Sequence, residues 1–231
     1  MQTRSTLSAI LAAALALAAA PVFATDSHDY AKNEYAIIRD GLAPDKKMSL
    51  ASHGEGEGGN ANFHVWLMVE PAHRKIAPLP NIGSDNNLDT GPKAYHAAWS
   101  KDSRRVAVSF RSDRHVVELN LYTVENRRAS VISGPSLFRE ATGRDVDSQE
   151  DLRRSIPEII WQGSDRFRLT ERRMFLTEDE GFAGKLGAYG KVTDKLDTGK
   201  WLVEFSAEAI GVLMPGNRYR IVDLKVGKFG E

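Results

Sequence analysis

The sequence predicts an all-β fold in which antiparallel sheets repeat along the chain, with one short helical insert. Two observations lead to this prediction. Apolar residues alternate with polar or small residues through most of the middle of the chain, as they do in strands with a buried face. In addition, a short segment centred on an aspartate recurs three times.

The composition is that of an ordinary globular protein. The 231 residues include 31 Lys and Arg and 31 Asp and Glu, and 42% are hydrophobic, which argues against disordered, collagen-like and coiled-coil chains. Zero net charge argues against nucleic acid as the main partner, because phosphate binding needs a basic surface. The absence of cysteine excludes disulfides, thiolate metal sites and cysteine nucleophiles.

Residues 1–24 have the pattern of a secretory signal peptide. Arg4 precedes the 12-residue apolar run Ala9–Ala20, and a small residue, Ala24, offers the cleavage site. Such a run spans about 18 Å as a helix against roughly 30 Å of hydrocarbon, so it is short for a membrane anchor. We therefore expect one β-rich domain over residues 25–231, in the bacterial periplasm or secreted, with no membrane span after cleavage.

The local pattern predicts several strands and one helix. Alternation with a period of two predicts strands at residues 63–69, 105–110, 116–124, 201–205 and 219–221. A capping pattern predicts a short helix over Ser148–Ser155, which Pro157 keeps from extending further. This helix is the single insert expected in the β fold.

The repeated segment has an apolar residue, a turn with Asp, a basic residue and then a strand. Asp45 and Asp102 are 57 residues apart, or 44 when the 13-residue polar loop Asn81–Lys93 is set aside. Asp102 and Asp165 are 63 apart, or 40 when the 23-residue segment Gly134–Ile156 is set aside. Propeller blades repeat at about 40–45 residues. The spacing therefore favours a small or incomplete β-propeller-like stack of antiparallel sheets, with a β-sandwich as the alternative.

The second copy, AAWSKDSRRVAVSF followed by VVELNLYTVENRR, resembles one blade of the TolB-type (WD40-like) β-propeller repeat. About three partial blades show this resemblance, which implies blade geometry and no particular chemistry. Lys101 and Ser103 stand where the family has Pro and Gly. Six blades would need about 240 residues, so at most four fit: three recognisable blades and a C-terminal sheet over residues 185–225. The ring is then either small or an open stack whose edge strands need covering.

The three aspartates themselves are expected to act in turns rather than in chemistry. Asp at such a position accepts hydrogen bonds from its own downstream backbone. A metal or acid–base role for Asp45, Asp102 and Asp165 is the alternative.

The Gly-rich stretch after residue 52 is the candidate metal site. His53, Glu55 and Glu57, with His64 in the next strand, are possible ligands for a divalent metal. The alternative is a flexible, solvated loop, because Gly-rich polar runs are commonly linkers. No phosphate-binding loop motif is present.

The candidate binding residues lie in the matching loop of the second repeat. Arg111, Asp113 and Arg114 would contribute to a mixed-charge mouth together with the corresponding segment 171–173, and arginine binds carboxylates and sugar acids. Trp66 is a candidate for stacking on a sugar. A solubilising rim and a core tryptophan are the alternatives.

Two functions remain open on the sequence. The first is an exported, non-enzymatic binding or interaction protein for an unknown protein, small-molecule or glycan ligand. The second is a metal-dependent periplasmic enzyme or metal-binding protein that uses the His53–His64 loop. No catalytic residues are assigned, because no coherent set such as Gly-x-Ser-x-Gly is present.

Overall fold

The fold consists of three successive antiparallel meanders of strands. The computed structural model describes residues 25–132, 134–145 and 151–227, so the predicted signal peptide lies outside it. The first meander is β1 (Ala36–Leu42), β2 (Met48–Glu55), β3 (Ala61–Val69) and β4 (Arg74–Gly83). The second is β5 (His96–Trp99), β6 (Arg105–Asp113), β7 (Val116–Glu125) and β8 (Arg128–Ile132). The third is β9 (Asp151–Trp161), β10 (Arg166–Thr177), β12 (Trp201–Met214) and β13 (Arg218–Val226).

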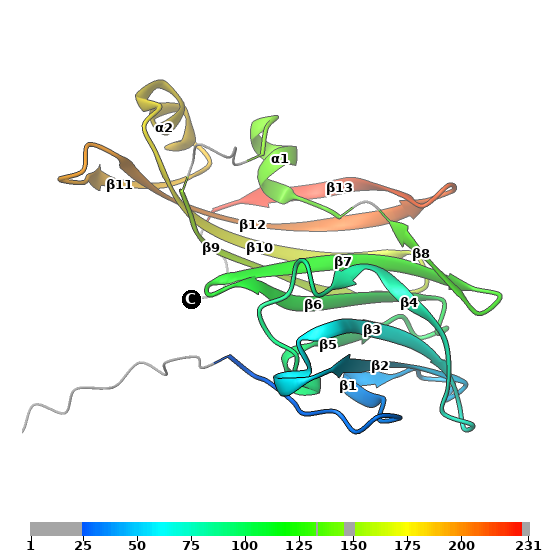
Figure 1. The fold of residues 1–231 in the computed structure, drawn as a ribbon. Coiled ribbons are helices and arrows are strands. Elements are labelled where there is room, and N and C mark those ends of the chain that lie inside the picture. The colour runs from blue at the N-terminus through cyan, green and yellow to red at the C-terminus, as the bar shows by residue number, and fades with distance from the viewer. Residues whose placement is uncertain (1–24, 133, 146–150, 228–231) are drawn as a thin grey trace, which may run out of the picture.

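Single parallel bridges join the meanders into one sheet of 13 strands. Arg39 of β1 pairs with His96 of β5, and Val116 of β7 pairs with Ser155 of β9. The meanders follow one another through the molecule, from blue to red in Figure 1. The prediction of an all-β fold is confirmed, and the strands predicted from alternation lie within β3, β6, β7, β12 and β13.

Two apolar layers separate the three meanders. Leu67 of β3 and Val108 of β6 belong to the layer between the first and second meanders. Ala107 of β6 and Leu169 of β10 belong to the layer between the second and third. Because neighbouring residues of a strand face opposite sides, β6 contributes to both layers. The second meander is therefore buried on both faces, which explains the apolar run from Val106 to Val108.

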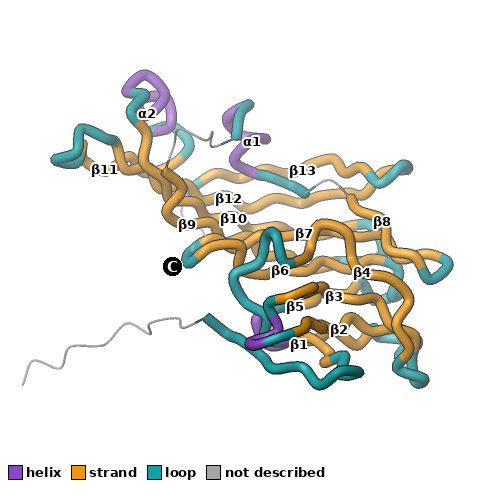
Figure 2. The backbone as a smooth tube through the Cα atoms, viewed as in Figure 1, coloured by secondary structure: helices purple, strands orange, loops and turns teal. Residues whose placement is uncertain are grey.

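The helices lie beside the third meander and not where the sequence placed one (Figure 2). They are α1 (Leu137–Thr142) and α2 (Glu180–Leu186), and two 3-10 turns, η1 (Glu57–Gly59) and η2 (Pro92–Ala94), lie in loops. Of the predicted helix Ser148–Ser155, residues 151–155 belong to strand β9, where Arg154 pairs with Met174, and residues 148–150 lie outside the described part. Pairing with β10 overrides the local capping pattern. Among the described residues, no helix is long and apolar enough to cross a membrane.

The C-terminal strands complete the third meander and do not form a fourth unit. The whole of β10 pairs with β12, and β11 (Gly190–Lys195) and β13 share the other edge of β12. The expectation of a separate C-terminal sheet was therefore wrong. The sequence could not show this, because the partner of an amphipathic strand is decided by tertiary contacts.

The predicted aspartate turns occupy equivalent places, between the first two strands of each meander. The Asp45 carboxylate accepts a hydrogen bond from Lys47 N at 3.0 Å, and Asp102 accepts one from Arg104 N at 3.2 Å. These bonds confirm the turn interpretation for both residues. The turns also touch, since Asp45 N donates to Ser103 Oγ at 3.1 Å.

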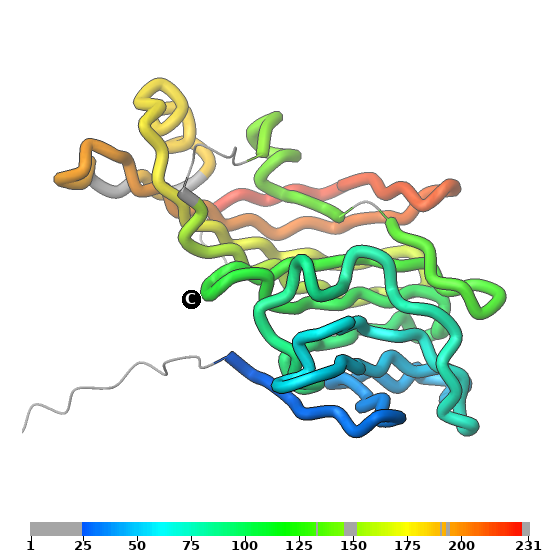
Figure 3. Tube along the Cα trace, viewed as in Figure 1, coloured from blue at the N-terminus to red at the C-terminus, as the bar shows by residue number. Residues whose placement is uncertain are grey.

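Residues 26–35 form a segment, here called the strap, that runs along the first meander (Figure 3, dark blue). Its first half is held by backbone hydrogen bonds: Asp26 O accepts from both Thr90 N and Gly91 N at 2.8 Å. Its second half is held by histidines. His53 Nδ1 lies 2.6 Å from Glu34 O, and His73 Nε2 lies 2.7 Å from Tyr35 O.

Candidate binding cleft

The four predicted metal ligands do not gather around one point. His53 and His64 face each other across β2 and β3, but each places its Nδ1 at a backbone carbonyl oxygen, that of Glu34 or that of Ile82. Glu55 accepts a hydrogen bond from the Asn62 side chain at 2.9 Å. No group of three or more potential ligands that could hold a metal ion is present in the described part of the chain, and that part includes Glu57.

The Gly-rich stretch instead packs against the strap. Gly58 N donates to the Asp29 carboxylate at 2.6 Å. Gly59 is buried with a positive φ of 65°, and a Cβ there would lie 2.6 Å from His28 O and 2.7 Å from the Tyr30 ring. Glycine is required at residue 59 for both reasons. The solvated-linker interpretation was therefore wrong for this part of the loop.

Arg111 forms an ion pair with a buried carboxylate inside the fold. Its Nε and Nη2 donate to the Asp89 carboxylate at 2.6 and 2.5 Å, and the Asp89 side chain is only 1% exposed. Asp89 also accepts from Asp26 N at 2.7 Å. The hydrogen bond with Asp89 raises the pKa of the Arg111 guanidinium. The Arg111–Asp89 pair connects the loop that precedes β5 to strand β6, and Asp89 connects the same loop to the strap.

The other predicted binding residues lie apart from one another. Asp113 and Arg114 are exposed in the β6–β7 turn, where Asp113 accepts from Arg114 N at 2.6 Å. Trp66 is half-buried on β3 between Tyr35 and His64, and the Lys75 ammonium lies 5.0 Å from its ring centre. The structure therefore does not bring Trp66 together with the arginines.

Segment 171–173, expected in a loop of the mouth, lies inside β10. Glu171 is 1% exposed, pairs with Arg173 Nε and accepts from Leu137 N at 2.6 Å. Burial raises the pKa of Glu171, and the charge of Arg173 opposes that shift. The expectation was wrong because Glu171 and Arg173 face the start of α1 from the strand, and only Arg172 between them is exposed.

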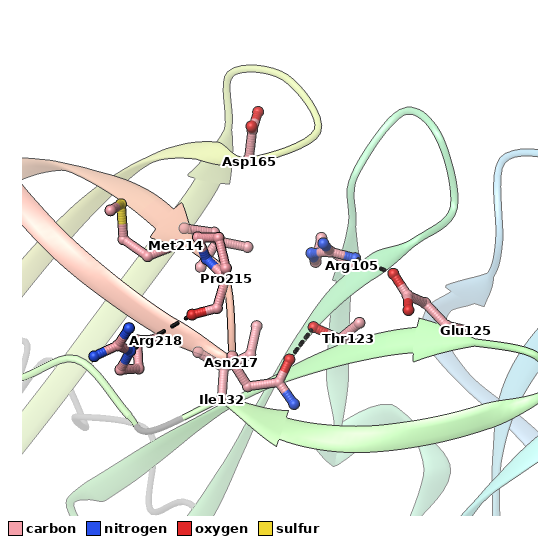
Figure 4. Close-up of a pocket in the computed structure, with 11 residues that line it drawn as sticks. Arg105, Thr123, Glu125, Ile132, Asp165, Met214, Pro215, Asn217 and Arg218 are labelled. Atoms are coloured by element: carbon pink, nitrogen blue, oxygen red, sulfur yellow. Dashed lines mark hydrogen bonds and ion pairs between the residues drawn. The ribbon is translucent and has the colours of Figure 1, made fainter.

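A cleft of about 350 Å³ opens between the second and third meanders (Figure 4). One wall is formed by the start of β6 and the ends of β7 and β8, with Arg105, Thr123, Glu125 and Ile132. The other wall is the β12–β13 turn over residues 213–218. Asp165, on the β9–β10 turn, also lines the cleft. Its size lies within the range of small-molecule sites, about 300–1,000 Å³.

Two hydrogen bonds fix the cleft walls. Thr123 Oγ donates to Asn217 Oδ1 at 3.0 Å across the two meanders. Leu213 N donates to Asp165 O at 2.7 Å, which ties the β9–β10 turn to β12. Asn217 has a positive φ of 55°, as does Gly216 at 80°, so the β12–β13 turn is tight. The cleft is thus built on paired strands and short turns.

The cleft is lined by charged side chains of both signs and by apolar side chains. Arg105 and Arg218 are the cations of the lining, and Glu125 and Asp165 are the anions. Glu125 is already occupied, because it accepts from Arg104 Nη2 at 2.7 Å. Apolar side chains complete the lining: Ile132, Leu213, Met214 and Pro215.

The sequence reasoning missed this cleft. It expected a turn at Asp165 and gave no binding role to Arg105 or Arg218. The pair Pro215-Gly216 is a turn signal that predicts a hairpin between β12 and β13. No local signal shows that this hairpin faces the end of β7, which is about 90 residues away in the chain.

No protein-family model, curated protein or solved structure matches the chain. The geometry and charges of the cleft are therefore the basis on which its role is assigned.

Proposed function

We propose that this chain is an exported binding protein that holds a small polar ligand in the cleft between the second and third meanders. The observation that carries the proposal is the cleft itself. It combines two arginines, two carboxylates and an amide with four apolar side chains, which is the composition of a site that orients a small ligand by a few polar groups. The role is binding rather than catalysis because no histidine or nucleophile with an adjacent base lines the cleft.

Export is supported by the N-terminal pattern and by where the strap begins. Cleavage after Ala24 would leave Thr25 as the first residue, directly before Asp26, whose N–H and C=O both form hydrogen bonds with residues 89–91. Cleavage at this point would keep every strap contact. A cut only a few residues later would remove the hydrogen bonds of Asp26.

In this proposal, the scaffold of the binding protein is an open stack of TolB-type repeat units. Lys46 and Ser103 support this idea, since both adopt positive φ values, 58° and 60°, in the turn where the family has glycine. The contact between consecutive turns, Asp45 N to Ser103 Oγ, also suits neighbouring units of one repeat.

The proposal is tested on the full chain expressed with its own leader in a bacterial host. N-terminal sequencing of the protein from the periplasm is expected to begin at Thr25. A thermal-shift screen of amino acids, sugars, sugar acids and dicarboxylates is then followed by calorimetry. We expect Arg218→Gln to weaken binding of any ligand found by at least tenfold, because the cleft loses a cation.

Arg220→Gln is the matched control, since Arg220 is an exposed arginine of the same strand that does not line the cleft. It is expected to leave binding unchanged. Binding that is insensitive to Arg218→Gln, or the absence of any ligand in the screen, would contradict the proposal.

A further inference from the structure

The charges of the cleft lining balance. The lining contains two cations, Arg105 and Arg218, and two anions, Glu125 and Asp165. A ligand with a single charge would pair with cleft groups of one sign only. The cleft groups of the other sign would lose water without gaining a partner, and an unpaired desolvated charge is costly. A ligand that carries both signs avoids this cost.

The groups that remain open for a ligand are separated in space. Among the described residues, Asp165 takes part in no ion pair, whereas Glu125 accepts from Arg104. Arg105 is also engaged, because its Nη1 lies 3.7 Å from the Glu125 carboxylate and donates to Arg104 O at 2.9 Å. Figure 4 shows Asp165 on its turn, apart from Arg218. Among the described residues of the lining, Asp165 and Arg218 are therefore the anion and the cation that take part in no ion pair.

The cation side has geometry suited to a carboxylate. Arg218 Nε lies 3.5 Å from Pro215 O, which lays the side chain along its own turn. The Asn217 amide uses its oxygen to accept from Thr123, so its nitrogen remains as a donor. Guanidinium and amide N–H groups together match the two oxygens of a carboxylate.

The remaining lining suits a short aliphatic group. Ile132, Leu213, Met214 and Pro215 are apolar, and a volume of about 350 Å³ is near the lower end of the range for ligand sites. The cleft is thus small and partly apolar, with one cation and one anion left for a ligand.

We propose that the ligand of the cleft is a zwitterion of the amino-acid class, with its carboxylate at Arg218 and Asn217 and its ammonium group at Asp165. This inference rests on the proposed function, because it names the ligand class of the same cleft. An aliphatic side chain of the ligand contacts the apolar residues of the lining.

Calorimetry on the full processed chain tests the inference with matched compounds. The 20 common amino acids are titrated first, and leucine is compared with 4-methylpentanoic acid, which lacks the ammonium group, and with 3-methylbutan-1-amine, which lacks the carboxylate. If another amino acid binds more tightly, its own two analogues are used. We expect the amino acid to bind at least tenfold more tightly than either analogue.

Asp165→Asn separates the two charges of the ligand. It is expected to weaken amino-acid binding by at least tenfold and to leave the acid analogue unchanged. Asp223→Asn, at an exposed aspartate of β13 outside the cleft, is the matched control and is expected to change neither. The comparison of analogues needs only the wild-type chain, so it stands even where a variant fails to fold.

The outcomes distinguish this inference from the proposed function. Equal binding of the amino acid and its acid analogue would overturn the zwitterion and leave an anion site. Binding of no amino acid would also overturn it, while a different ligand that is sensitive to Arg218→Gln would preserve the proposed function. No ligand of any class would contradict both.

Discussion

The indole Nε1 of Trp161 donates to the backbone oxygen of Ala98 at 2.8 Å, from the first strand of the third meander to the first strand of the second. Trp99 makes the corresponding bond to Gly41 at 3.1 Å, from the second meander to the first. Each acceptor precedes the residue that aligns with the tryptophan in the repeat. The same indole-to-backbone hydrogen bond therefore joins the second meander to the first and the third meander to the second.

Trp161→Phe is expected to lower the free energy of unfolding by about 1–2 kcal/mol, because the ring is retained but the bond to Ala98 is lost. Chemical denaturation measures this change. Trp201→Phe is the matched control, since the buried Nε1 of Trp201 has no hydrogen-bond partner in the described part of the chain. A loss at residue 201 as large as that at residue 161 would show that the indole bond contributes nothing.

Lys46→Gly is expected to raise the free energy of unfolding by about 0.5–1 kcal/mol. Lys46 is exposed and has a φ of 58°, a conformation that costs an L-residue about 1–2 kcal/mol and glycine little. The neighbouring change Lys47→Gly is the control and is expected to have the opposite sign, because residue 47 has no positive φ. Thermal or urea unfolding of both variants measures these changes in the free energy of unfolding. A Lys46→Gly protein no more stable than wild type would contradict the argument from the positive φ of residue 46.

The strap is expected to be held most firmly in mildly acidic solution. His73 lies between two acceptors, the Glu70 carboxylate at 2.8 Å and Tyr35 O at 2.7 Å, so both ring nitrogens donate only in the protonated form. The hydrogen bond to Glu70 raises the pKa of His73 above 6.5. Burial raises the pKa of Glu70, but hydrogen bonds from Ser49 and His73 outweigh burial and lower it below 4.5.

The pH dependence of stability follows from the pKa shifts of His73 and Glu70. The contribution of His73 is fully present below pH 6.5 and is lost as the pH rises through its folded pKa, and that of Glu70 is present above pH 4.5 and is lost as the pH falls through its folded pKa. The stability difference between wild type and His73→Gln should therefore be largest between about pH 4.5 and 6.5. His96→Gln, which removes an exposed pair with Asp40, is the control and should leave amide-exchange protection of the strap unchanged. A difference independent of pH would contradict this account.

Glu171→Gln is expected to lower the free energy of unfolding by about 2–4 kcal/mol, because the largely buried Arg173 loses its buried charge partner and keeps only the exposed Asp145 at 3.7 Å. Urea unfolding measures the change. Glu158→Gln serves as the control, since Glu158 is an exposed carboxylate of the neighbouring strand β9. If both variants unfold at the same urea concentration as wild type, the buried pair does not stabilise the third meander.

Local signals predicted much of the fold but not the site. Alternation placed strands such as β3 and β7 correctly, and the turns at Asp45 and Asp102 follow from the tendency of Asp to bond its own backbone. Glu171 looked like a loop residue because a buried carboxylate is rare, and only its contact with Arg173 and α1 makes it tolerable. The cleft joins Arg105 to Arg218, which are far apart in sequence, and such proximity arises only when the layers stack.

The most direct test of the binding cleft is a two-dimensional spectrum of the arginine Nε–Hε groups recorded while the tightest-binding amino acid is added. The account predicts that the signal of Arg218 shifts and saturates as the amino acid binds, while that of Arg220 stays in place. Saturable binding that leaves the Arg218 signal unmoved would contradict it.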